Sequence, residues 1–238
     1  QKHIAPRSGR YTAPGVTVAA HDDALILPGN DGFATADGIW RDPGLAAFDP
    51  GRMQLKEHGA VAALAGGRVL IRRFGPTTDL AEGIFAGGTY SHNYFHFLIE
   101  VLPRVLIAAD AAPAGVPVLA DAGMPAQCLQ ALRIFLPGRP ILQLSRHSAV
   151  RVGRLHAAGM PAIVQDVFDP SGAPVDAVRI HPAALQRLAR LGAELRGASQ
   201  VERLLLRRES GVRRLVNAPE IEADLVSRFE LTKAEASV

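Results

Sequence analysis

The 238-residue sequence has little cysteine, no long apolar run and only a small excess of charge of one sign. The single cysteine, Cys128, excludes an internal disulfide, and its apolar helical surroundings predict a buried structural thiol. No apolar run approaches the roughly 18 residues that a membrane-spanning helix needs. The net charge of +3 comes without a Lys/Arg run interleaved with aromatics, which argues against a nucleic-acid partner. The 48% of hydrophobic residues are enough for a sizeable core in one large domain or two small ones.

Several motifs that identify enzyme classes are also missing. There is no G-x-G-x-x-G after a predicted strand, no Walker loop, no C-x-x-C, no H-E-x-x-H, no Asp-x-Asp and no G-x-S-x-G. The glycine pair Gly87-Gly88 is isolated and predicts no ligand site by itself. His92 and His96 have the spacing of two zinc ligands, but no third ligand lies nearby in the sequence, so we expect no metal.

The most informative segment is Tyr90–Arg104, with the sequence YSHNYFHFLIEVLPR. Read as a helix from about residue 93 to residue 110, it carries polar groups four residues apart along one face. These are His92, His96, Glu100 and Arg104. The other side has the spacing of a core-facing stripe. This stripe comprises Phe95, Leu98, Ile99, Leu102, Val105 and Leu106. Because Pro103 lies inside the helix, we expect a kink or a restart there.

Two imidazoles, a carboxylate and a guanidinium on one face can transfer protons and hold anions. His96 can accept a proton from a hydroxyl group while Glu100 orients the imidazole, or Glu100 can be the base itself if burial raises its pKa. A solvated helix surface with some ion pairing is the alternative. Aromatic residues around the stripe disfavour that alternative: Tyr90, Tyr94, Phe95 and Phe97.

Arginine is concentrated in the last third of the chain. A predicted strand at 201–206 is followed by RRESGVRR, and Asn217 precedes a predicted helix at 218–229. Arg207 and Arg213 would flank the end of the strand, where guanidinium groups can bind a diphosphate through paired hydrogen bonds. A surface loop rich in arginine is the alternative reading of this segment.

Strand and helix signals alternate after residue 84, which predicts an α/β protein with parallel sheets. The expected strands are 116–120, 141–144, 149–157 and 201–206, and the expected helices are 125–136, one beginning at 182, and 218–229. Shorter strand candidates lie at 16–19, 24–27 and 68–72. We therefore expect a strand-rich N-terminal region at 1–82, a first Rossmann-like domain at 83–198 and the start of a second, doubly wound domain at 199–238. Ligands in such folds bind at the carboxyl ends of strands, beside helix N-termini.

The segment His92–Arg104 resembles the N-[YF]-[FW]-H-[FW]-L-x-[ED]-x-L-P-R signature of glycosyltransferase family 61, whose bacterial members are often called capsular polysaccharide biosynthesis proteins. The segment Leu206–Asn217 is similar to the R-R-x-x-x-x-R-x-[IVL]-x-N-E block of that family, although Ala218 replaces its glutamate. The two blocks occur in the family's order. The family continues into a G-x-H-G-A-x-x-x-N block that the 238 residues do not contain, so we expect an incomplete second Rossmann-like unit.

The resemblance implies a GT-B-like α/β fold and an inverting, metal-independent glycosyltransferase without a cofactor. Such an enzyme transfers a sugar from a nucleotide-sugar donor to a saccharide or lipid-linked acceptor in capsular or surface polysaccharide biosynthesis. His96 and Glu100 would be catalytic, and the substrate-binding residues would be His92, Asn93, Arg104, Arg207, Arg208, Arg213 and Asn217. The expected location is cytoplasmic, either free or at the inner face of the cell membrane.

Two other classes of protein fit the same residues. One is a non-catalytic carbohydrate-binding or scaffold relative of the family. The other is a sugar-phosphate-handling α/β enzyme that would use the same arginines and release phosphate without an acceptor.

Overall fold

The computed structural model describes residues 15–42, 61–65, 68–71, 77–145, 148–164, 178–196, 204–207, 217–229 and 232–235. The chain divides into two units, Gln1–Ala189 and Arg190–Val238, and each is treated by itself below.

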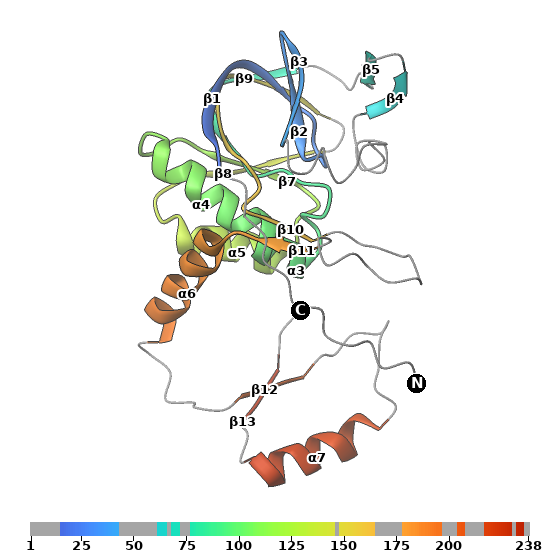
Figure 1. Ribbon diagram of the computed structural model, residues 1–238, viewed down its shortest axis with the longest axis vertical. Coiled ribbons are helices and arrows are strands. Elements are labelled where there is room, and N and C mark those ends of the chain that lie inside the picture. Colours follow the sequence, from blue (N-terminus) through green and yellow to red (C-terminus); the bar gives the residue numbers. More distant parts are fainter. Residues whose placement is uncertain are drawn as a thin grey trace. The chain divides into compact units, whose positions relative to one another are not determined.

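A mixed seven-stranded sheet forms the centre of the first unit (Figure 1). Its strand order is β3 (Gly38–Arg41), β2 (Gly32–Thr35), β1 (Val18–Ile26), β9 (Ala149–Ala158), β6 (Thr77–Phe85), β7 (Val118–Asp121) and β8 (Ile141–Leu144). The strands β9, β6, β7 and β8 are parallel, whereas β3, β2, β1 and β9 are joined by antiparallel pairs. The predicted α/β class is confirmed, and the parallel part of the sheet is compatible with a Rossmann-like arrangement.

The N-terminal strands belong to this same sheet. The candidates at 16–19 and 24–27 form the single strand β1, which pairs with β9 over its whole length. The strand-rich region therefore continues the central sheet through β1, β2 and β3. Two further strands, β4 (Val61–Ala65) and β5 (Arg68–Ile71), form a separate antiparallel pair.

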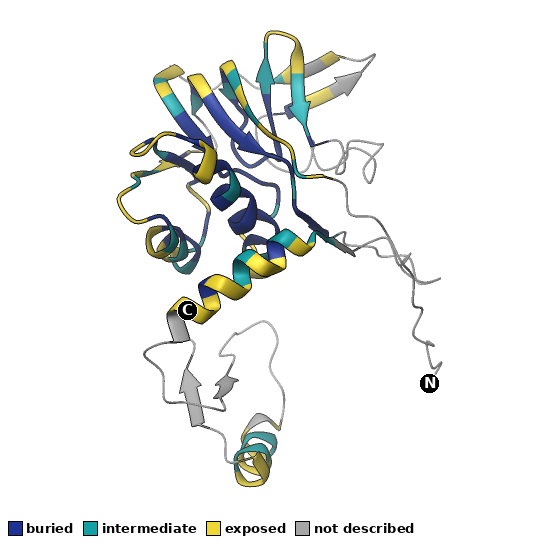
Figure 2. Cartoon of the chain, turned by 60° about the vertical axis from the view of Figure 1, so that its left-hand side comes forward, coloured by how far each residue is buried: buried dark blue, intermediate teal, exposed yellow. Residues whose placement is uncertain are grey.

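Helical connections join the parallel strands. Between β6 and β7 lie α3 (Tyr94–His96), the π-helical turn η1 (Phe97–Val101) and α4 (Leu102–Ala111). Between β7 and β8 lies α5 (Ala126–Phe135). α4 packs against β9, β6 and β1, and Figure 2 shows it as a largely buried helix. The connection from β6 to β7 thus places its helix in the core of the unit.

The apolar face of β9 shifts by one residue in the middle of the strand. Val150 and Val152 are buried, and the next buried side chain is that of Leu155. The shift falls at Gly153, where an added Cβ would lie only 2.8 Å from the carbonyl oxygen of Ala81 on β6. A glycine at this position lets the two parallel strands approach closely.

Two smaller sheets complete the described residues. β10 (Ala162–Val164) and β11 (Val178–Ile180) form an antiparallel pair, followed by α6 (Pro182–Arg196). In the second unit, β12 (Leu204–Arg207) and β13 (Thr232–Glu235) pair in parallel, with α7 (Ala218–Phe229) between them in the sequence. A parallel strand pair connected by a helix is one βαβ unit, the building block of doubly wound sheets.

The close approach at Gly153 can be tested by Gly153→Ala. Because the new methyl group would meet a backbone oxygen at 2.8 Å, we expect the free energy of unfolding to fall by about 1–3 kcal/mol, measured by urea denaturation. The matched control is Gly192→Ala on α6, where an added Cβ has no neighbour within 4 Å. It should stabilise the protein by roughly 0.5–1 kcal/mol. Similar effects of the two substitutions would contradict the account of β9.

Candidate functional site

The segment Tyr90–Arg104 forms two α-helical pieces joined by a π-helical turn. The side chain of Asn93 caps α3 by accepting a hydrogen bond from the backbone N–H of Phe95 at 3.0 Å. In η1, the N–H of Leu102 donates to the carbonyl of Phe97, five residues earlier. α4 then begins with Pro103 in its first turn, where the missing N–H is not needed. The expected kink or restart therefore takes the form of a π-helical turn, a feature often found at functional sites.

Three of the four predicted polar residues are buried together. His96 and Glu100 are each 4% exposed and Arg104 is 1% exposed. His92 lies in the turn before α3 and is exposed, because the helix begins at Tyr94 and not before it. The alternative of a solvated helix surface is therefore wrong for His96, Glu100 and Arg104.

The predicted core stripe is correct only after the π-helical turn. Leu102, Val105 and Leu106 are buried as expected, but Phe95 is 53% exposed. Phe97 and Val101 fill the core in the preceding turn instead. The π-helical turn contains more residues than an α-helical turn, so an α-helical spacing cannot be extended backwards through it.

His96 and Glu100 form a buried hydrogen-bonded pair. His96 Nδ1 lies 2.8 Å from Glu100 Oε2. The other carboxylate oxygen, Oε1, accepts a hydrogen bond from the backbone N–H of Val164, the last residue of β10. Glu100 is thus held from both sides, and its carboxylate fixes one edge of the imidazole.

Burial raises the pKa of Glu100, against the opposing effects of the hydrogen bonds from His96 and Val164. The nearby charge of Asp31 adds to the increase of the pKa. A carboxylate that is removed from water and touches an imidazole is a frequent feature of sites for proton transfer.

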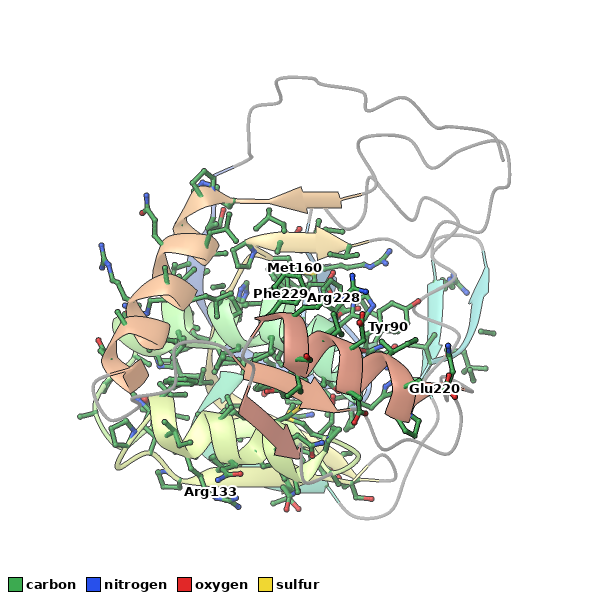
Figure 3. All side chains as sticks on the ribbon, turned by 90° about the horizontal axis from the view of Figure 1, so that it is seen from below. Tyr90, Arg133, Met160, Glu220, Arg228 and Phe229 are labelled. Atoms are coloured by element: carbon green, nitrogen blue, oxygen red, sulfur yellow. The ribbon has the colours of Figure 1, made fainter. Side chains whose placement is uncertain are left out.

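Two aromatic rings contact the imidazole of His96. The ring of Tyr90 (labelled in Figure 3) stacks on His96 with centroids 4.7 Å apart and an interplanar angle of 27°. Phe95 approaches edge-on, with centroids 5.5 Å apart and an angle of 80°. Nδ1 is directed at Glu100, so Nε2 is the ring nitrogen that does not bind this carboxylate.

Arg104 contacts the carboxyl end of β6. Its Nη2 donates a hydrogen bond to the carbonyl of Gly87, and its Cζ lies 5.3 Å from the centroid of the Phe85 ring. Among the described residues, no hydrogen-bond partner reaches the buried Nε and Nη1. The guanidinium therefore fixes the strand end and keeps two donors for a further acceptor.

A buried carboxylate that the sequence reasoning missed connects the segments around this site. Asp121, the last residue of β7, is 2% exposed. Its Oδ1 accepts from the N–H of Gly29 at 2.8 Å, and its Oδ2 accepts from the Ser91 hydroxyl at 2.8 Å and from the N–H of Gly88 at 3.2 Å. Asp121 thereby joins the β1–β2 turn, the end of β6 and the turn before α3. Its position directly after an apolar strand was the signal that could have identified it.

The glycine pair at the end of β6 allows these close contacts. An added Cβ at Gly88 would lie 3.1 Å from Asp31 Oδ1 and 3.6 Å from Arg104 Nη2. An added Cβ at Gly87 would lie 2.8 Å from the Phe85 ring. Asp31 is itself buried, and sequence reasoning missed it as well. Gly87 and Gly88 thus have a packing role beside the His96–Glu100 pair.

The arginine-rich segment is described only in part. Arg207 is the last residue of β12, and Asn217 is an exposed residue before α7 whose carbonyl accepts the N–H of Ile221 at 3.1 Å. Arg208 and Arg213 lie outside the described residues. Arg207 and Asn217 belong to the second unit and His96 to the first.

Within the described residues, no group of three or more His, Cys, Asp or Glu side chains could hold a metal ion. Cys128 is buried as predicted, and burial raises its pKa to about 11. Among the helices of the described ranges, none combines the length and the hydropathy of a membrane span. Comparisons of the sequence with protein-family models and with curated proteins gave no match.

The raised pKa of Glu100 predicts a pH dependence of stability. Its ordinary value is 4.5, and the higher value in the folded state means that the fold binds this proton more tightly than the unfolded chain does. The free energy of unfolding should therefore fall as the pH rises from about 4.5 through the folded-state pKa, and then level off. Urea titrations between pH 4 and pH 8 should show a smaller fall for Glu100→Gln than for the unchanged protein. The exposed Glu194→Gln serves as the control, and equal pH dependence of all three proteins would contradict the prediction.

Proposed function

We propose that the chain belongs to an inverting glycosyltransferase similar to family 61, which transfers a sugar from a nucleotide-sugar to a saccharide or lipid-linked acceptor in surface polysaccharide synthesis. The observation that carries this proposal is the buried His96–Glu100 pair, 2.8 Å apart, following the carboxyl end of the parallel strand β6. The pair occupies the H and [ED] positions of the segment that resembles the family signature. Inverting transfer needs a base at the acceptor hydroxyl, and a histidine hydrogen-bonded to a carboxylate can act as that base.

In the proposed reaction, His96 Nε2 takes the proton of the acceptor hydroxyl as its oxygen attacks the anomeric carbon. The new glycosidic bond forms on the face opposite the leaving group. The bond to the nucleoside diphosphate breaks, and the diphosphate leaves with the bonding electron pair. Glu100 stabilises the imidazolium that forms, and its hydrogen bond from Val164 holds the carboxylate in place.

Burial supports this role, because a charge pair formed in a site with little water interacts more strongly than it would in bulk water. We propose that Arg104 shapes the end of β6, next to the His96–Glu100 pair, through its hydrogen bond to the carbonyl of Gly87. Asn93 holds the start of α3, the helix that contains His96, by capping it. His92, exposed at the start of the segment, remains a candidate contact for substrate.

The donor would be held by the second unit. We propose that its diphosphate binds to Arg207, Arg208 and Arg213 and near the helix that follows Asn217, since guanidinium groups and a helix N-terminus both favour anions. No metal is required for this arrangement, because the arginines neutralise the charge of the leaving group.

His96→Ala tests the identity of the base. With a panel of nucleotide-sugars and mixed saccharide acceptors, we expect the release of nucleoside diphosphate to fall by about 10²–10⁴-fold. Glu194→Gln, at an exposed residue of α6 with no proposed role in the reaction, should leave this activity unchanged. Full turnover by His96→Ala would rule out the proposed base. Phosphate release without any acceptor would instead favour the sugar-phosphate enzyme, and no binding of nucleoside diphosphates at millimolar concentration would favour the scaffold relative.

Glu100→Gln tests how the imidazole is oriented. The glutamine can still accept the Val164 N–H, but its amide would donate to His96 Nδ1, so the imidazole proton would have to sit on Nε2. His96 would then be unable to accept a proton at that atom. We expect kcat to fall about 10³–10⁴-fold with little change in the KM for the donor, in a variant that remains folded by circular dichroism. Unchanged kcat in the folded variant would show that Glu100 does not set the tautomer.

A further inference from the structure

Phe95 is exposed to solvent at a position where a buried side chain was expected. Its ring is 53% exposed, although its neighbours Phe97 and Val101 in the next turn are buried. The backbone of Phe95 is fixed, because its N–H donates to the Asn93 cap at 3.0 Å. The ring is therefore held at the surface by a defined turn of helix and not by a loose loop.

The exposed ring contacts the proposed catalytic pair. Phe95 meets the imidazole of His96 edge-on at 5.5 Å between centroids, while the stacked Tyr90 covers one of the imidazole faces. Single exposed apolar residues are common on protein surfaces. In contrast, the exposed Phe95 ring is in direct contact with the buried, carboxylate-paired His96.

The proposed chemistry decides which substrate that is. A base removes the proton of the acceptor, so the acceptor hydroxyl must come within hydrogen-bond distance of the imidazole, about 2.6–3.2 Å. One face of many pyranoses presents several C–H groups and is apolar enough to pack on an aromatic ring.

We propose that Phe95 is the platform on which the acceptor sugar packs, so that the acceptor is a saccharide whose terminal pyranose stacks by its C–H face beside His96. This inference rests on the proposed function for the role of His96, but it adds the substrate class and the residue that binds it. Phe95 acts in binding and orientation of the acceptor, and takes no part in proton transfer.

The test is saturation-transfer difference NMR on the full 238-residue chain, with methyl β-D-galactopyranoside, methyl β-D-glucopyranoside and methyl α-D-mannopyranoside as probes. We expect saturation of the ring C–H protons of at least one probe. Phe95→Ala should raise the dissociation constant roughly threefold to tenfold, because one ring contact is lost. Phe95→Tyr should restore the dissociation constant of the unchanged protein. The control Ile134→Ala, which removes a 49% exposed apolar side chain on α5, should have no effect.

The outcomes separate this inference from the proposed function. Absence of saturation for all three probes, or equal binding by Phe95→Ala and the unchanged protein, would overturn the platform. Binding that depends on Phe95 in a protein that transfers no sugar would support the platform and count against the glycosyltransferase. Sugar transfer by the unchanged protein, with the same acceptor KM in Phe95→Ala, would support the glycosyltransferase and count against the platform.

Discussion

A proline near the start of α4 determines the path of the chain through the site. Pro103 has no N–H to donate, and its ring would crowd the carbonyl four residues earlier in a regular α-helix. The chain accommodates it with the π-helical turn Phe97–Val101. Two features follow from this turn: Phe97 and Val101 enter the core, and Phe95 moves to the surface.

Burial of the Glu100 and Asp121 carboxylates makes an unfavourable contribution to the folding free energy of this site. Burial raises the pKa of both Glu100 and Asp121, which means that their charged forms are less favourable in the fold than in water. Asp121 is compensated by three hydrogen bonds from three segments, and Glu100 by two. Such groups contribute poorly to stability, so their presence around the end of β6 is better explained by function.

Much of the fold could be predicted from sequence, because strand and helix periodicities are local. The strand at 141–144 and the helix at 218–229 are found with those bounds. The pairing of β1 with β9 could not be predicted, since it joins residues that are far apart in the sequence, from Val18 with Ala158 to Ile26 with Val150, and leaves no local signal. In the site, the i, i+4 pair of His96 and Glu100 followed from helical spacing. The exposure of Phe95 and the roles of Asp31 and Asp121 did not, because they depend on the π-helical turn and on contacts between β1, β6 and β7.

The central claim is that Glu100 holds His96 in the form that can take a proton at Nε2. The most direct measurement is the tautomer of neutral His96, read from the ¹⁵N chemical shifts of its imidazole in the labelled protein. The account predicts a protonated Nδ1 that donates to Glu100 and an unprotonated Nε2. A neutral His96 with its proton on Nε2 would contradict it.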